Sequence, residues 1–238
     1  MMSLGGRMLG VLIGFGTLAA ACGGGDSSLD GEWMPEEAEL IIAASAEAMG
    51  AVTSVRFDLQ HSGASVYIDP VESLALQAVI GRFIVPDEAD ALVTVNVNDN
   101  LKTELGAVAV GPDVWMSNPI TGKFEPLPVG YNIDPRTFFD PRGGWQPLLA
   151  DITDPVFVAV EDNRYHLTGT ATAAQIEIVT AGLVSGTDVA VDLWIHPVTA
   201  VVTRVEFPTD AENGRSDWVL ELSEYGEEFS IVAPDVDG

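Results

Sequence analysis

The sequence predicts an α+β protein in which one large, curved antiparallel sheet packs on a few helices. Segments that alternate apolar and polar residues follow one another through most of the chain, separated by short turns rich in Gly, Pro, Asn and Asp. Helical patterns are few: one precedes the strands, one lies in a central insert and one follows it. This order, without a linker or an internal repeat, favours helices packed on one face of an antiparallel sheet.

The first helix is predicted over residues 35–49. Pro35 suits the first helical position, and Glu36 and Glu37 favour the positive end of the helix dipole. Gly50 is a typical residue at which such a helix ends.

Strands account for most of the remaining pattern. In the first of them Val55, Phe57 and Leu59 share one face, while polar residues occupy the other. So many strands in one sheet would curl strongly. The predicted strands cover residues 54–60, 65–68, 72–85, 91–98, 101–110, 114–116, 156–160, 164–169, 187–196, 200–207 and 218–225.

The central insert, residues 131–155, differs from its surroundings because it is rich in Pro and Gly. A short helix is predicted near residues 145–150, within this insert. A further helix is predicted over residues 172–181, with Gly182 as its stop.

The N-terminus carries the features of a secretion signal with a lipid anchor. Residues 1–21 combine one positive charge, Arg7, with a short apolar run and small residues, and are predicted to be a signal peptide. Cys22 is the only cysteine and stands where a bacterial lipobox places the residue that is acylated after cleavage. Residues 22–33 then read as a flexible tether, and residues 34–238 as one domain. An ordinary signal peptide followed by a chance cysteine is the alternative.

The charge balance restricts the partners. The chain holds 36 acidic and 10 basic residues, a net charge of −26. This composition argues against nucleic acid, whose phosphates need clusters of Lys and Arg, and against adhesion to anionic membranes through a basic patch.

The sequence offers little support for catalysis, and we expect no enzyme, no metal and no cofactor. His61, His166 and His196 do not have the spacing of a zinc site, and no G-x-S-x-G motif is present. Many acidic residues make chance proximity of carboxylates the better explanation for any pair.

Rows of aliphatic side chains suggest an apolar cavity on the concave side of the sheet. A large curved sheet with few helices does not readily fill that side, and a dry apolar cavity accepts alkyl chains. Each row by itself is also what an ordinary core contains. The strand residues predicted to line the cavity are Val55, Phe57, Leu59, Val93, Val95, Val189, Val191, Leu193 and Ile195.

The central stretch YNIDPRTFFDPRGGWQPLLADITDPVFVAVEDNRYHLTGTATAAQIE resembles the LppX/LprAFG lipoproteins. The closing stretches VDLWIHPVTAVVTRVEF and WVLELSEYGEEFSIVAPD resemble the last strands of that family. The matching positions are Asp140-Pro141, Gly144, Leu148-Leu149-Ala150, Thr153-Asp154 and Tyr225-Gly226-Glu227.

The resemblance implies a LolA/LolB-like half-barrel over helices, with an apolar cavity for a multi-acylated lipid or glycolipid. The chain would then be a lipoprotein of the cell membrane, anchored by acyl groups such as palmitate on the extracytoplasmic side, where an envelope transporter is a possible partner. Phe138, Phe139 and Trp145 are expected near the cavity entrance. Two other functions remain open: an anchored protein-interaction module without lipid cargo, and an envelope lipid hydrolase.

Overall fold

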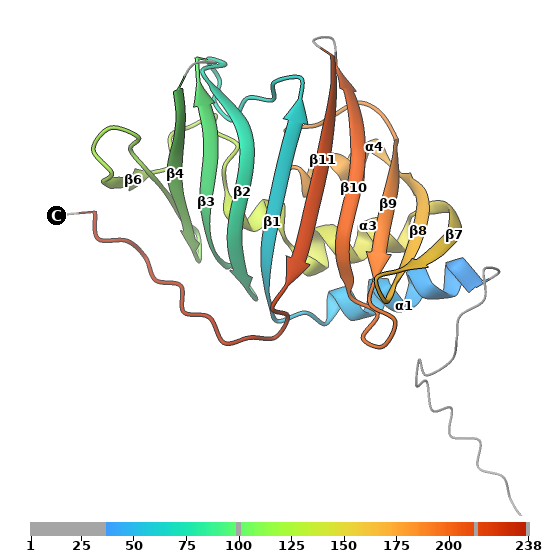
Figure 1. Cartoon of the computed structure of the whole chain (residues 1–238). Coiled ribbons are helices and arrows are strands. Elements are labelled where there is room, and N and C mark those ends of the chain that lie inside the picture. The colour runs from blue at the N-terminus through green and yellow to red at the C-terminus, as the bar shows by residue number, and fades with distance from the viewer. Residues whose placement is uncertain (1–36, 99–100, 212–213, 237–238) are drawn as a thin grey trace, which may run out of the picture.

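A single curved antiparallel sheet dominates the computed structural model, which describes residues 37–98, 101–211 and 214–236. Figure 1 shows the sheet with helices behind it, and this arrangement confirms the predicted α+β class. The strands of the described residues are β1 (Ser54–Gly63), β2 (Leu74–Ile84), β3 (Glu88–Val97), β4 (Leu101–Val110), β5 (Asp113–Ser117), β6 (Phe124–Pro126), β7 (Thr153–Glu161), β8 (Arg164–Ala171), β9 (Val189–Ile195), β10 (Val202–Ala211) and β11 (Gly214–Ser223).

The sheet consists of two meanders that meet in the middle. Its strand order is β6-β5-β4-β3-β2-β1-β11-β10-β9-β8-β7, so β1 pairs with both β2 and β11. The insert between β6 and β7 therefore has to cross from one edge of the sheet to the other. It does so on the helix side and forms α2 (Pro135–Phe138), the π-helical turn η2 (Pro141–Trp145) and α3 (Gln146–Ala150).

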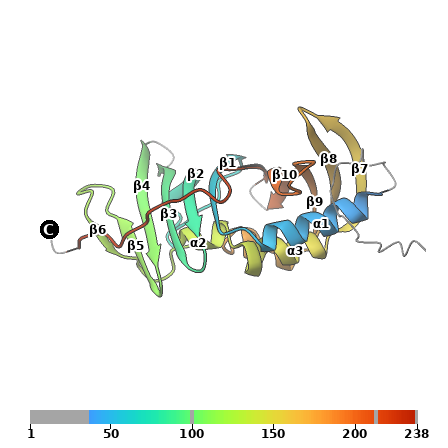
Figure 2. The ribbon, with the colours of Figure 1, turned by 90° about the horizontal axis from the view of Figure 1, so that it is seen from below.

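Two further helices complete the helix layer. Helix α1 (Ala38–Gly50) precedes β1 and packs beside α3 and η2, and α4 (Ala173–Val179) connects β8 to β9. Figure 2 shows α1 and α3 side by side below the strands. Helix α4 begins with a capping box formed by Thr172 and Gln175. In it, the Thr172 N–H donates a hydrogen bond to the Gln175 side-chain oxygen.

Alternation along the strands puts the apolar core on the helix side. Phe57, Gly81, Ala91 and Ala107 are cross-strand neighbours in one inward row of β1–β4. A Cβ added at Gly81 would lie 2.4 Å from the Phe57 ring, so the missing side chain makes room for that ring. Burying each large apolar side chain contributes about 1.5–3 kcal/mol.

The segment 65–68, predicted as a strand, is not one. Only an isolated bridge joins Tyr67 to Ala75, because the chain turns at Asp69. The Asp69 carboxylate accepts hydrogen bonds from the backbone N–H groups of Ser73 and Leu74 and thereby fixes the turn. Strand β6 and helix α2 were not expected, since three or four residues are too few to produce a periodic pattern.

His61 is a titratable side chain inside this core. It is 6% exposed and lies against Trp218, with 4.6 Å between the ring centroids. Its Nδ1 lies 3.1 Å from the Leu76 carbonyl oxygen, and its Nε2 has no hydrogen-bond partner among the described residues. Burial lowers the pKa of His61 below 6.5, against the opposing effects of the Leu76 hydrogen bond and of Asp217.

We expect this histidine to make the fold sensitive to acid. Below about pH 6.5 the unfolded chain binds a proton at His61 before the folded chain does, so stability falls until the lower folded-state pKa is passed. His61→Asn keeps an amide that can donate to Leu76 and should remove this component, which has a slope of up to about 1.4 kcal/mol per pH unit. Urea unfolding from pH 7.5 to 5 measures the difference, and equal slopes for the two proteins would contradict it.

Candidate functional site

The predicted cavity residues lie together on the helix side of the sheet. Those whose side chains the structure describes are at most 6% exposed and belong to one apolar cluster. Cys22 and the side chain of Phe138 lie outside the described residues. The clustered residues are Val55, Phe57, Leu59, Val93, Val95, Phe139, Trp145, Val189, Val191, Leu193 and Ile195. They pack against the protein's own side chains, and their role as a lipid-facing lining stays a prediction.

Open apolar space lies instead along helix α1. A recess of about 510 Å³, here called the α1–β11 recess, opens at the C-terminal end of this helix. Val52 and Leu222 form part of its buried wall. Its lining is Ala48, Ala51, Val52, Thr53, His196, Thr199, Val201, Thr203, Leu222, Ser223, Tyr225 and Gly226.

Tyr225 closes one side of the α1–β11 recess. Its hydroxyl donates to the Val202 carbonyl oxygen and lies 3.7 Å from the Met49 sulfur. Burial raises the pKa of Tyr225 well above its ordinary value, so the phenol remains a neutral donor. The next residue is also attached to the sheet, because the Gly226 N–H donates a hydrogen bond to the Ser54 carbonyl oxygen at 3.0 Å.

A second recess, here called the α1–β7 recess, lies between α1 and the segment that joins α3 to β7. It has a volume of about 560 Å³. Its lining is Glu39, Ile42, Ala43, Ala46, Ala150, Ile152, Thr153, Asp154 and Pro155. A third hollow beside α1, which Ile195 helps to line, measures only about 10 Å³ and is close to the size of one water molecule.

Helix α1 therefore covers the sheet with open space at two places along its length. Its large buried apolar side chains are Ile41, Ile42 and Met49, and the rest of its buried face consists of Ala and Ser. Small side chains bury little apolar area, so they add little to the attachment of the helix.

Two buried polar atoms near this cover lack partners. Ser45 Oγ lies on the buried face of α1, and Trp145 Nε1 lies in η2, which contacts α1. Neither atom has a hydrogen bond with any described residue. An unpaired buried donor costs about 1–3 kcal/mol. The Trp145 ring stacks on Phe139 at 6.0 Å between centroids, so the indole is held in place by apolar contacts alone.

The charged groups elsewhere in the described part of the chain form ion pairs across neighbouring strands. Among the described residues, no group of three or more His, Cys, Asp or Glu side chains could hold a metal ion. His166 lies between Glu161 and Asp192, with its ring nitrogens 3.2 and 2.9 Å from their oxygens. The Trp194 indole and His166 both donate to Glu161 and lower the pKa of its carboxyl group. These side chains stabilise the outer face of β7–β9.

Tyr225→Phe tests the closure of the α1–β11 recess. The change leaves the Val202 carbonyl oxygen without its donor and should cost roughly 1 kcal/mol of unfolding free energy. Amide hydrogen exchange at Gly226 should accelerate, because this N–H bonds to Ser54 next to the loosened ring. Tyr131→Phe is the matched control, since the Tyr131 hydroxyl has no hydrogen-bond partner among the described residues. Equal exchange in both variants would show that the Tyr225 hydroxyl does not hold the recess closed.

Two crystal structures of other proteins are similar to this fold. The crystal structure of LprF from Mycobacterium bovis superposes with a TM-score of 0.63 at 19% identity, covering 87% of this chain and 100% of that chain. The crystal structure of the lipoprotein LppX from Mycobacterium tuberculosis superposes with a TM-score of 0.56 at 16% identity, covering 84% and 100%.

At the level of sequence, no curated protein matches the chain significantly. None of the helices in the described residues is both long enough and apolar enough to cross a bilayer. The pattern of the LppX_LprAFG lipoproteins matches residues 37–231, which is most of the chain. The chain therefore belongs to the LppX_LprAFG lipoprotein family.

Proposed function

We propose that the protein binds the acyl chains of a lipid or glycolipid between its sheet and helix α1, and carries or presents this lipid in the cell envelope while Cys22 anchors it to the membrane. Membership of the lipoprotein family supports the anchor and the location. The observation that carries the binding role is the pair of open apolar recesses along α1, of about 510 and 560 Å³.

The physical argument concerns what lies behind α1. The inward face of β9 is aliphatic, and its Ile195 lines the small hollow beside Ile41 of α1, so displacement of α1 would expose apolar side chains of this part of the sheet. Each CH₂ group of an acyl chain gains about 0.8 kcal/mol by leaving water for such a surface. The lipid would thus replace contacts that α1 makes through three large side chains, and the recesses are where its chains would enter.

The unpaired buried donors fit the same ligand. Acyl lipids carry ester or amide carbonyl oxygens next to their chains, and these oxygens accept hydrogen bonds. Ser45 Oγ and the Trp145 indole N–H are buried beside α1 without an acceptor. We propose that the carbonyl groups of the lipid bind at these donors. Phe138, Phe139 and Trp145 remain the proposed entrance region.

Mass spectrometry of organic extracts from the purified protein tests the proposal. Co-purified acylated species at near-stoichiometric amounts are expected. The packed interior favours the alternative of an anchored protein-interaction module, and that alternative predicts extracts with no acyl species above the level of a control protein purified from the same cells. The second outcome would refute the lipid-binding function.

Trp145→Phe tests the proposed hydrogen bond to the lipid. The change removes a buried donor that has no partner, which is favourable, but it also leaves a small cavity, so the free energy of unfolding of the lipid-free protein is measured alongside lipid binding. The amount of bound lipid should nevertheless fall about tenfold, the loss expected for one neutral hydrogen bond. Trp194→Phe is the control, because that indole donates to Glu161 on the outer face. Unchanged lipid content in Trp145→Phe would remove the indole from the site.

Cys22→Ala tests the anchor separately from lipid binding. Without the thiol no acyl group can be attached, and two acyl chains are what a stable anchor requires. The variant should move from the membrane fraction to the soluble envelope fraction and lose metabolic labelling with palmitate. Its extracts should still contain the lipid cargo. If the wild type and Cys22→Ala are equally soluble and neither incorporates palmitate, the N-terminus is an ordinary signal peptide followed by a chance cysteine.

A further inference from the structure

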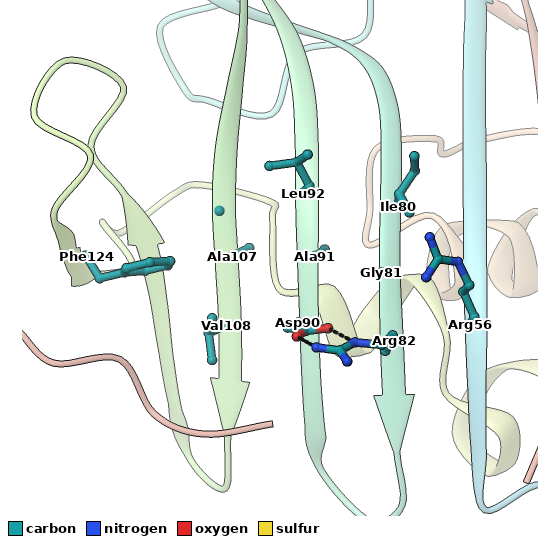
Figure 3. A pocket seen from close by; sticks show the side chains of 11 residues that line it. Arg56, Ile80, Gly81, Arg82, Asp90, Ala91, Leu92, Ala107, Val108 and Phe124 are labelled. Atoms are coloured by element: carbon teal, nitrogen blue, oxygen red, sulfur yellow. Dashed lines mark hydrogen bonds and ion pairs between the residues drawn. The ribbon is translucent and has the colours of Figure 1, made fainter. Parts of the chain in front are cut away.

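A further hollow lies on the outer face of the sheet, away from the helices. It has a volume of about 330 Å³ and spreads over β1–β4, bordered by β6. Figure 3 shows Ile80, Leu92 and Val108 around it, with Phe124 at one end and Arg56 at the other. We call it the outer-face hollow. None of the predicted cavity residues lines it.

The register of the strands explains why the sheet is hollowed here. Ile80 lies opposite Leu92, and Leu92 lies opposite Gly106, so these residues form one outward row. Gly106 contributes no side chain, and the Phe124 ring occupies the adjoining space. A Cβ added at Gly106 would lie only 2.8 Å from Phe124 Cζ. Backbone therefore forms the floor between two apolar walls.

The walls of the hollow expose apolar side chains to solvent. Leu92 is 44% exposed and Ile80 is 37% exposed. Neighbouring positions on this face carry charged side chains, including Arg82 and Asp90 in the next outward row. A small apolar surface is thus framed by charges.

Arg56 supplies an unused positive charge at one end of the hollow. It lies directly opposite Arg82 in the β1–β2 ladder, an arrangement of like charges that is normally destabilising. Arg82 is compensated, because its Nε donates to Asp90 at 3.0 Å and its guanidinium lies over the Phe229 ring. Arg56 is exposed and has no hydrogen-bond or ion-pair partner among the described residues.

This free cation stands out in a chain with 36 acidic residues. Each of the other arginines in the described part of the chain bonds to an oxygen of the protein. Figure 3 shows the guanidinium of Arg56 reaching from β1 towards Gly81 and Ile80, whereas that of Arg82 points to Asp90. The positive group therefore faces the apolar walls and is available to an anion.

We propose that the outer-face hollow binds a single-chain anionic amphiphile, whose carboxylate or phosphate pairs with Arg56 and whose alkyl chain lies across Ile80, Leu92 and Val108 towards Phe124. Arginine binds such head groups through paired hydrogen bonds. The site is separate from the recesses along α1, and its existence does not depend on the proposed function.

Dodecanoate below its micelle concentration is the probe, titrated into the full ¹⁵N-labelled chain and followed by amide chemical shifts. Saturable shifts are expected along the outer face of β1–β4, including Gly81 and Gly106. Arg56→Gln should raise the Kd about tenfold, because one charged hydrogen-bonding partner is lost. Arg56→Lys should restore part of the affinity. Arg215→Gln, which changes an exposed arginine paired with Asp217 on β11, should leave the Kd unchanged.

Two further ligands separate the head group from the chain. Acetate at the same concentration should give no saturable shifts, and neutral dodecyl maltoside should bind much more weakly than dodecanoate. Leu92→Asn, at a position that is 44% exposed, should weaken dodecanoate binding and leave the urea midpoint of unfolding unchanged.

Three results would overturn the proposal. The first is the absence of shifts on β1–β4, or shifts confined to α1 that Arg56→Gln does not alter. The second is acetate binding as tightly as dodecanoate, which would make the ligand a small free anion. The third is equal affinity for dodecyl maltoside, which would exclude a role for the charge. None of these results affects the extraction experiment, which reports on the interior.

Discussion

The pairing of β1 with β11 is the interaction on which the rest of the structure depends. It joins the two meanders into one sheet, so β6 and β7 become opposite edges. The chain must then cross one face of the sheet between β6 and β7, and the insert crosses the inner face as α2, η2 and α3. The same pairing brings Ser54 next to the end of β11, where Gly226 bonds to it and positions Tyr225. The cover of the sheet and the closure of its lower end thus follow from one ladder.

The two faces of this sheet carry different chemistry. The inner face is largely apolar and is covered by helices, of which α1 attaches through few large side chains and leaves space at two places. The outer face carries ion pairs such as Arg204 with Glu221, and Arg82 with Asp90. A cover held mainly by small side chains can separate from the sheet at lower cost than a fully interdigitated helix, because less apolar area is exposed when it moves.

The alternation of apolar and polar residues was sufficient to predict most helices and strands. It was not sufficient to predict which residues from distant segments lie together. Strand β4 matches its predicted bounds, since alternation and flanking turns are properties of neighbouring residues. The inward rows that include Val55 and Val191 were also recognisable, and they are buried. The α1–β11 recess was not foreseeable, because Ala48, Thr203 and Tyr225 come from distant segments and have no shared periodicity. The outer-face hollow likewise depends on the register that places Gly106 beside Leu92, which no single strand reveals.

Folded proteins form hydrogen bonds with nearly all of their buried polar groups. Among the described residues, Ser45 Oγ, His61 Nε2 and Trp145 Nε1 are buried without a partner, whereas the buried carboxylate of Asp69 accepts several hydrogen bonds. Arg56 is an exposed arginine without a partner in the same part of the chain. Ser45 Oγ and Trp145 Nε1 are buried beside the helix cover, and in the proposed function a ligand would bring an acceptor to them when α1 is displaced. The unpaired cation lies outside, beside exposed leucine and isoleucine side chains. An uncharged acceptor attached to alkyl chains suits the first position, and an anion attached to one alkyl chain suits the second. The two proposed sites would therefore differ in the head group that they select, while both would depend on contact with aliphatic side chains.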